Sequence, residues 1–329
     1  MIQTVCGPVA PQSLGRTLAH EHVVMMTEWL LRDFPQYSYP GGRDAVQEKV
    51  VATMRRLKAA GIDALVDCSA LGHGRDIGLV ADASASSGLH VVACTGIYTY
   101  DELPLAFKRQ EPLRPGRVTD FMTEMFLTDI ESGIQGTDIR AGAIKCASDA
   151  PGITANIDRI FRACAQAHRI TGAPITTHTN VANRGGLDQQ RIFREEGVDL
   201  SRVIIGHSGD STDIDYLRAL LDAGSFIGAD RFGLHTPTLP GLEHRVATVA
   251  ELVGLGYEDQ ILLSQDASIH TDWWPGPASE HGFPDSWHMF YVVDTVLPAL
   301  GAAGVSAEAI HKMLVDNPAR AFATGAAYS

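Results

Sequence analysis

Short apolar runs that suit buried β-strands alternate along most of the chain with longer segments of helical periodicity. Runs that are nearly continuous in hydrophobic residues are typical of strands buried on both faces of a parallel sheet. Eight runs fit this description: Leu18–His22, Ala64–Asp67, Val91–Thr95, Ala141–Lys145, Pro174–His178, Val203–His207, Phe226–Asp230 and Ile261–Asp266. The pattern therefore predicts eight strands that alternate with helices.

Several of the intervening segments carry helix signals. In residues 46–57, 157–164 and 214–221 the apolar positions recur every three or four residues, and a glycine follows each segment. Asp210 and Ser211 offer an N-cap to the third of these helices. A C-terminal helix is also predicted, and its last residues are Asn317–Phe322.

This alternation predicts a single (β/α)8 TIM barrel, an α/β fold. An open doubly wound sheet fits less well, because no G-x-G-x-x-G turn follows the first strand. The Gly7-Pro8 pair and Pro11 predict a short N-terminal β-hairpin. Residues 267–285, rich in tryptophan and proline, predict an ordered loop. With neither a linker nor a low-complexity segment, residues 1–329 are predicted to form one domain.

Composition and charge narrow the range of partners. The formal net charge of −13 argues against nucleic acid or an anionic membrane. We see no signal peptide at the N-terminus, and no apolar run approaches the ~20 residues of a membrane span. The chain has five cysteines without C-x-x-C spacing, which favours free buried thiols and a reducing cytoplasm over a disulfide framework.

Polar residues that can bind metals stand where the predicted strands end. In a (β/α)8 barrel, residues at the C-terminal ends of strands point into the active site. Four imidazoles and a carboxylate at such positions suit zinc or a similar divalent ion. The candidates are His20, His22, Lys145, His178, His207 and Asp266.

Each candidate also has a purely structural interpretation. His178 and His207 could be hydrogen-bonded core histidines, and Asp266 could be a helix N-cap or a loop acid. Lys145 could anchor an anionic substrate or extend its amine to solvent. The functional alternative is that its neutral amine takes up CO2 and forms a carbamate that bridges two metal ions. Only the placement of all six at the same end of different strands favours a metal centre. Five other histidines are predicted to lie on helices or on loops away from the mouth, as surface or packing residues: His73, His168, His244, His288 and His311.

These residues, in this order, resemble the amidohydrolase superfamily, and Gly15–His22 resembles the opening motif of its phosphotriesterase family. The likeness extends to Asn317–Arg320 and is strongest to the phosphotriesterase-like lactonases. Three further stretches carry it: Gly96-Ile97-Tyr98, Asp230-Arg231-Phe232-Gly233, and Asp266 with Thr271-Asp272-Trp273. Two loops, residues 33–37 and 235–241, do not match the family pattern.

The resemblance implies a binuclear metal centre at the C-terminal mouth of the barrel. One ion would be held by His20, His22, Lys145 and Asp266, and the other by Lys145, His178 and His207. Lys145 would be carboxylated (N6-carboxylysine), and a hydroxide bridging the two ions would attack the substrate. Asp266 would take its proton. Zinc suits such a site best, and cobalt, iron or manganese also suit it.

The resemblance also implies a substrate class. Tyr98 stands where the family's lactonases have a tyrosine and its organophosphate specialists a tryptophan. Tyr98 and Arg231 could orient a lactone, and Trp273 could line an acyl channel; the structural alternatives are a wall aromatic, an ion pair and loop packing.

The implied function is therefore a lactonase for N-acyl-homoserine lactones (quorum quenching) or related γ- and δ-lactones, with promiscuous phosphotriesterase activity. The alternatives are a phosphotriesterase or esterase with the same metal centre and, less favoured, a non-catalytic binding protein. Relatives suggest a homodimer.

Overall fold

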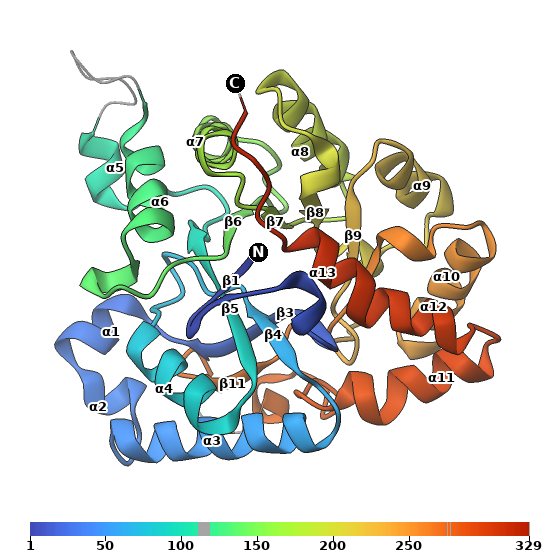
Figure 1. Ribbon diagram of the computed structural model, residues 1–329, viewed down its shortest axis with the longest axis horizontal. Coiled ribbons are helices and arrows are strands. Elements are labelled where there is room, and N and C mark those ends of the chain that lie inside the picture. Colours follow the sequence, from blue (N-terminus) through green and yellow to red (C-terminus); the bar gives the residue numbers. More distant parts are fainter. Residues whose placement is uncertain (111–118, 275, 277, 329) are drawn as a thin grey trace.

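The structure is a computed structural model that describes residues 1–110, 119–274, 276 and 278–328. Its strands are β1 Ile2–Thr4, β2 Gly7–Val9, β3 Thr17–Met25, β4 Ala64–Asp67, β5 His90–Gly96, β6 Ala143–Ala147, β7 Ile175–His178, β8 Val203–Ile205, β9 Phe226–Ala229, β10 Ile261–Leu263 and β11 Ser268–Thr271. β1 and β2 pair antiparallel, which confirms the predicted hairpin. The others form one parallel sheet in the order β10-β9-β8-β7-β6-β5-β4-β3-β11 (Figure 1).

Backbone hydrogen bonds close this sheet into a barrel. β11 pairs with β3, and the segment between β10 and β11 runs along the same strand. There the Asp266 N–H donates to the His20 carbonyl at 3.1 Å, and the His22 N–H donates to the Ala267 carbonyl at 2.9 Å. The predicted (β/α)8 barrel is therefore confirmed.

β11 corrects the prediction of a loop at residues 267–285. β3 extends to Met25, beyond its predicted end at His22, and β11 pairs with that extension. Buried backbone groups need hydrogen-bond partners, so the apolar continuation of β3 requires a neighbouring strand. Positions 275 and 277 of the predicted loop lie outside the described residues.

Helices surround the barrel (Figure 1). They are α1 Glu28–Asp33, α2 Pro35–Ser38, α3 Arg43–Ala59, α4 Ile77–Ser87, α5 Leu105–Arg109, α6 Phe121–Glu131, α7 Ala155–Thr171, α8 Gly185–Glu195, α9 Ile214–Asp222, α10 Leu242–Gly254, α11 Leu297–Ala302, α12 Ala307–His311 and α13 Asn317–Ala321. Helices α3, α7 and α9 confirm the three helical patterns. The N-cap of α9 is Asp213, whose side chain accepts from Tyr216 N, so the predicted cap at Asp210 and Ser211 was wrong. Asp210 instead belongs to a 3-10 turn that begins at Ser208.

The core consists of two hydrophobic clusters. The outer cluster fills the space between the sheet and the helices. The inner cluster lies inside the barrel and contains small strand residues such as Val66 and Val92. Ile2, Leu14 and Phe322 belong to the same inner cluster, and the Val5 N–H binds the carbonyl of Val91, near the start of β5. The N-terminal segment therefore closes the end at which the strands begin, and the opposite end remains open.

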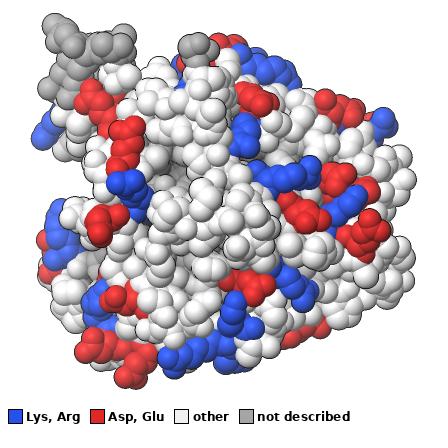
Figure 2. Space-filling model, viewed as in Figure 1, with Lys and Arg blue, Asp and Glu red and all other residues white. Residues whose placement is uncertain are grey.

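Acidic and basic side chains are interspersed over the face drawn in Figure 2, and no large area of that face carries one sign of charge. In the described part of the chain, no helix is both long and apolar enough to cross a membrane. All five cysteines are free. Four are buried, but Cys6 is exposed, contrary to the prediction that all the thiols are buried.

Candidate metal centre

The open end of the barrel holds a cavity of about 220 Å³. Imidazole, amine, guanidinium and carboxylate groups form one part of its lining, and aromatic and aliphatic side chains form the rest. The structure brings all of the predicted ligands into this one cavity: His20, His22, Lys145, His178, His207 and Asp266. Residues from five different strand ends thus meet at one point, although they are far apart in the sequence.

His20 and His22 both face the cavity, and a β-bulge contributes to this arrangement. The register between β3 and β4 shifts between Leu18 and Glu21, so β3 contains an extra residue there. Ala19 packs in the inner cluster and His20 lines the cavity, so two consecutive side chains face the inside of the barrel. Bulges commonly redirect a side chain in this way next to functional sites.

His207 and Asp266 lie beyond the ends of their strands in left-handed backbone conformations, with φ of 61° and 54°. β8 ends at Ile205 and β10 at Leu263, so both strands were predicted too long. Residues other than glycine adopt this conformation only where their surroundings hold it, and such positions cluster at functional sites.

The buried carboxyl group of Glu21, whose pKa burial raises to about 8, holds the backbone around Asp266. Its Oε1 accepts from Ser264 Oγ at 2.6 Å and from Gln265 N at 3.0 Å, and its Oε2 accepts from Ala267 N at 2.9 Å. These hydrogen bonds fix both sides of the left-handed residue. Glu21 lies between the two histidines of β3, and no pattern in the sequence predicts a role for it.

Lys145 lies in β6 with its side chain buried at 1% exposure. Its Nζ is 2.6 Å from His20 Nε2, and no carboxylate of the described residues lies within 4.0 Å of it. A buried ammonium without a counter-ion is costly, and a modification that makes the group an anion would remove this cost. Position 96 of the neighbouring strand β5 requires glycine, because a Cβ there would lie 1.9 Å from the Lys145 carbonyl oxygen.

The distances between ligand atoms fit divalent metal ions. Two ligands bound tetrahedrally to one zinc ion lie roughly 3.4 Å apart, given bond lengths of about 2.1 Å. His22 Nε2 is 3.3 Å from Asp266 Oδ1, and His20 Nε2 is 3.7 Å from the same oxygen. His207 Nε2, a proposed ligand of the other ion, is 3.7 Å from Asp266 Oδ2. Imidazole nitrogens and carboxylate oxygens are also the donors that zinc prefers.

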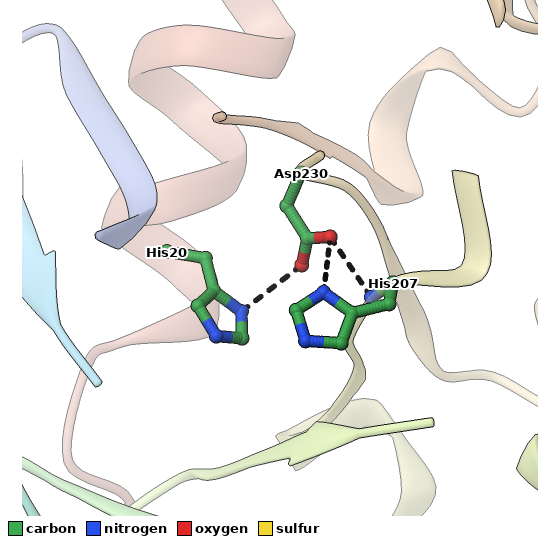
Figure 3. A group of neighbouring side chains, drawn as sticks. All are labelled: His20, His207 and Asp230. Atoms are coloured by element: carbon green, nitrogen blue, oxygen red, sulfur yellow. Dashed lines mark hydrogen bonds and ion pairs between the residues drawn. The ribbon is translucent and has the colours of Figure 1, made fainter. Parts of the chain in front are cut away.

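Asp230 orients two of the imidazoles (Figure 3). His20 Nδ1 donates to Asp230 Oδ2 at 3.0 Å, and His207 Nδ1 and its backbone N–H both donate to Oδ1 at 2.9 Å. These three residues form one of the groups of close ligand atoms among the described residues. However, each Nδ1 already binds a carboxylate oxygen, so Asp230 fixes the tautomers and turns each Nε2 toward the cavity.

The other two imidazoles have partners of their own. His22 Nδ1 donates to Ser69 Oγ at 2.9 Å, and this hydroxyl donates to the Val24 carbonyl. His178 Nε2 donates to Asp149 Oδ2 at 3.0 Å. The nitrogens left to face the cavity are therefore Nε2 in His22 and Nδ1 in His178, and Arg231 Nη2 lies 3.5 Å from the latter. Hydrogen bonds of this kind orient metal ligands and raise their basicity.

The charge states of three proposed ligands, His178, His207 and Asp266, suit metal binding. Burial lowers the pKa of His178 to about 4, and burial together with Arg231 holds the pKa of His207 well below its usual range. Both imidazoles are then neutral at pH 7 and offer a lone pair. Although burial opposes its ionisation, the positive groups around Asp266 hold its pKa well below the usual range, so it is a carboxylate.

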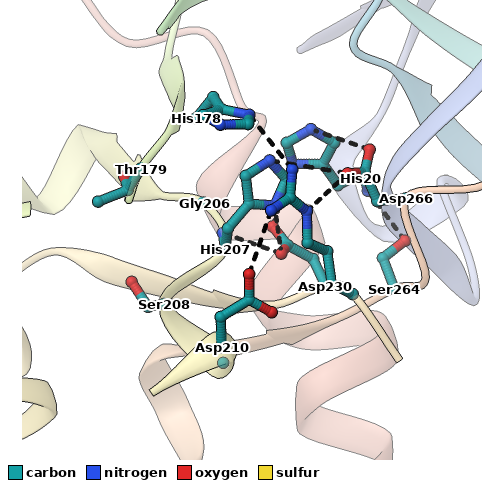
Figure 4. A network of polar contacts seen from close by, with 12 residues as sticks. His20, His178, Thr179, Gly206, His207, Ser208, Asp210, Asp230, Ser264 and Asp266 are labelled. Carbon is teal, nitrogen blue, oxygen red and sulfur yellow. Dashed lines mark hydrogen bonds and ion pairs between the residues drawn. The ribbon is translucent and has the colours of Figure 1, made fainter. Parts of the chain in front are cut away.

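Arg231 lines the cavity, but its hydrogen bonds go to protein groups: two carboxylates and, at 3.5 Å from its Nη2, the Nδ1 of His178. Its Nε donates to Asp266 Oδ2 at 3.0 Å and its Nη1 to Asp210 Oδ2 at 3.1 Å. Figure 4 shows Asp210, Asp266 and His178 within the same polar network. These contacts correspond to the structural alternative, an ion pair. Arg231 therefore contributes a fixed positive charge beside Asp266.

Tyr98 and Trp273 both line the cavity, with ring centroids 6.1 Å apart. The Tyr98 hydroxyl contacts the hydroxyl of Tyr100, and the Tyr98 ring meets the ring of His178 edge-on at 5.6 Å. Trp273 is 37% exposed and lies where the cavity meets solvent. Both positions are compatible with contact to a substrate. Trp274, Phe283 and Trp287 extend the aromatic lining.

Some residues of the site were not predicted from the sequence. His73 was predicted to lie away from the mouth, which was wrong: it is buried in the cavity wall against His22 and Tyr98. Asp230 could have been identified, because it ends a predicted strand as the proposed ligands do. Ser69 and Asp149 gave no such signal, since loop conformation alone brings them to the imidazoles.

Comparison with known proteins places these observations in a family. A profile of the phosphotriesterase family matches residues 1–322. A phosphotriesterase homology protein of Mycobacterium tuberculosis is 45% identical over 324 residues, which cover 98% of this chain and 97% of that protein. An aryldialkylphosphatase of Saccharolobus solfataricus is 36% identical over 315 residues, 95% and 96% of the two chains.

Two solved structures resemble the fold closely. The phosphotriesterase from Mycobacterium tuberculosis has a TM-score of 0.91 at 44% identity and covers 98% of both chains. A mutant of a PTE-like lactonase from Deinococcus radiodurans has a TM-score of 0.89 at 35% identity, with coverage of 98% of this chain and 100% of the other. The similarity therefore extends over the whole barrel, including the strand ends that carry the cavity residues.

Proposed function

Since this chain belongs to the phosphotriesterase family and is a metal-dependent hydrolase that acts on ester bonds, we propose that its substrates are lactones. N-acyl-homoserine lactones and related γ- and δ-lactones are the proposed class, with phosphotriesters as weaker, promiscuous substrates. Hydrolysis adds water across the ring ester, breaks the bond between the carbonyl carbon and the ring oxygen, and yields a hydroxy acid.

Two divalent ions, zinc in the first instance, would be held by the predicted ligands. His20, His22, Lys145 and Asp266 would hold one, and Lys145, His178 and His207 the other. Carboxylation of Lys145 by CO2 would replace a buried ammonium by an anion shared between the ions. The described residues place no counter-ion at its Nζ, which supports this proposal. When bound, the ions lower the pKa of water and polarise the carbonyl group of the substrate.

The protein's own groups would guide the proton. The Asp266 carboxylate accepts a proton from the attacking water and returns it to the alkoxide of the opened ring. Arg231, 3.0 Å from Asp266 Oδ2, keeps this carboxylate ionised and fixed in direction. The Glu21 hydrogen bonds hold the backbone on either side of it.

The phenol of Tyr98 is the observation that most favours lactones over the other candidate substrates. Its ring lies in the cavity wall against His178, and its hydroxyl is paired with the Tyr100 hydroxyl. A phenol at this place can donate a hydrogen bond to a ring oxygen, which an apolar aromatic cannot do. Trp273, at the outer edge of the cavity, would contact an acyl chain.

A phosphotriesterase or esterase is the second candidate. The aromatic lining formed by Trp273, Trp274, Phe283 and Trp287 would also accept an aryl leaving group. The 36% identity to an aryldialkylphosphatase supports this alternative.

An assay of metal-quantified protein on three substrates distinguishes the candidates. We expect about two ions per chain, and a kcat/KM for an acyl-homoserine lactone or a γ-lactone well above that for an aryl phosphotriester. A chelator-treated sample, assayed before and after metal is restored, is the control. Preference for the phosphotriester or a simple ester would overturn the lactone assignment. Protein without metal and without turnover would support a non-catalytic binding protein.

A further inference from the structure

The imidazole of His73 is a buried polar group in the cavity wall that the proposed mechanism does not use. His73 lies in the loop after β4, and its side chain is 1% exposed. Its ring centroid is 4.0 Å from that of Tyr98, 4.9 Å from that of His22 and 5.5 Å from that of Trp273. It thus lies between a proposed metal ligand and two proposed substrate contacts.

The hydrogen bonds of the loop fix the tautomer of His73. The Ala70 N–H donates to His73 Nδ1 at 3.1 Å, and the His73 N–H donates to the Ala70 carbonyl at 3.0 Å. A backbone N–H can only donate, so Nδ1 must be an acceptor, and the proton of the neutral ring must be on Nε2. Nε2 has no hydrogen-bond partner in the described part of the chain, and the residue lines the cavity.

The loop also holds the ring in a fixed position. The Met26 N–H donates to the His73 carbonyl at 2.7 Å, and the Tyr98 N–H donates to the Leu71 carbonyl at 2.8 Å. Gly72 has a φ of 102°, and a Cβ there would lie 2.5 Å from the Tyr98 carbonyl oxygen, so the loop packs closely against the backbone of Tyr98. The Nε2–H is therefore a preorganised donor that needs little ordering when a ligand binds.

We propose that the Nε2–H of His73 determines specificity by donating a hydrogen bond to an acceptor oxygen on the substrate, close to the reacting carbonyl group. The inference rests on the proposed lactonase function. Because His73 packs against His22, whose Nε2 is 3.3 Å from Asp266, the donor lies beside the reacting groups. The favoured substrates are lactones with an amide, keto or hydroxyl oxygen on or next to the α-carbon, and unsubstituted alkyl lactones are disfavoured.

This role follows from the cost of an unused donor. A lactone without an acceptor leaves a buried N–H unpaired, whereas a substituted lactone satisfies it. Sites that bind a polar group of the substrate discriminate strongly against analogues that lack it. The proposed selectivity is a ratio of two kcat/KM values, for an α-acylamino-γ-lactone and for a γ-alkyl lactone of equal carbon number.

Two substitutions separate the donor from the structural role of the ring. In His73→Asn the short side chain can still accept from the Ala70 N–H, but it does not reach the position of Nε2. In His73→Gln the amide N–H reaches that position, but the bond to Ala70 is lost. We expect His73→Asn to lower the selectivity ratio roughly tenfold, the effect of one hydrogen bond, and His73→Gln to retain most of it. His90→Asn, at the start of β5 and the closed end of the barrel, is the control for loss of an imidazole.

Melting temperatures and both rate constants are measured for every variant. An unchanged ratio in folded His73→Asn, with both substrates slowed equally, would overturn the proposal. If His73→Asn does not fold, His73→Gln decides: a folded variant without selectivity overturns the proposal, and retained selectivity supports it. If the wild type hydrolyses neither lactone, the proposed function fails first, an outcome distinct from equal turnover of both lactones.

Discussion

Asp230→Asn should weaken metal binding, because one carboxylate orients a proposed ligand of each ion. Asp230 Oδ1 accepts from His207 Nδ1 and from the His207 backbone N–H, both at 2.9 Å, and its Oδ2 accepts from His20 Nδ1 at 3.0 Å. Asparagine offers one oxygen and one NH2 group. Its oxygen is expected to take the place with two donors, so that the NH2 group faces His20.

His20 must then change its tautomer. Two N–H groups cannot face each other, so His20 Nδ1 becomes the acceptor and the proton moves to Nε2. This nitrogen then loses the lone pair with which it would bind metal. Loss of such an orienting partner typically lowers metal affinity 10- to 100-fold, about 1.4–2.7 kcal/mol. We expect the ion held by His20 to lose the most affinity.

Competition with a chelator, monitored by metal content per chain, measures this effect. Asp149→Asn is the matched variant for the ion proposed to be held by Lys145, His178 and His207. Of the six proposed ligands, Asp149 hydrogen-bonds only His178. Asp63→Asn, which removes a carboxylate paired with Lys58, is the control. If Asp230→Asn keeps both ions with wild-type affinity, Asp230 does not set the tautomer of the ligands and the reasoning is wrong.

Three further predictions concern other groups. Lys145→Ala should lose most activity and metal, with partial rescue by a short carboxylic acid that replaces the carbamate; full retention of both would contradict the bridging role. Tyr98→Phe should lower kcat/KM for lactones several-fold more than for aryl phosphotriesters, and equal losses would exclude an orienting phenol. Arg43→Gln should cost up to about 1 kcal/mol of unfolding free energy at pH 7. Although burial opposes it, hydrogen bonds from Arg43 and Tyr39 lower the pKa of Asp76 in the folded state. Their contribution is therefore complete above the unfolded pKa of about 3.9 and lost as pH falls through the lower folded value. Urea titrations at pH 7 and pH 2 should show a smaller difference between wild type and variant at the acidic pH.

The order and type of the main elements were predictable because their signals are local. Continuous apolar runs such as Ala64–Asp67 and helical spacing such as that in residues 46–57 depend on neighbouring residues alone. β11 was missed because Ser268–Thr271 is a strand only by pairing with the extension of β3. The wrong N-cap of α9 has a similar cause, since Asp210 and Asp213 are equally good capping residues and the turn at Ser208 decides between them.

The sequence determined which side chains could meet, since residues that end parallel strands of a barrel gather at its mouth. The tertiary structure decided how they meet. The bulge before Glu21, the left-handed backbone at Asp266 and the tautomers set by Asp230 depend on contacts between residues far apart in the chain. The same holds for His73, which looked like a surface or packing histidine until the loop after β4 packed it against Tyr98. Local sequence indicates where each strand lies, but exact strand ends, hydrogen-bond partners and loop positions arise only when the barrel closes.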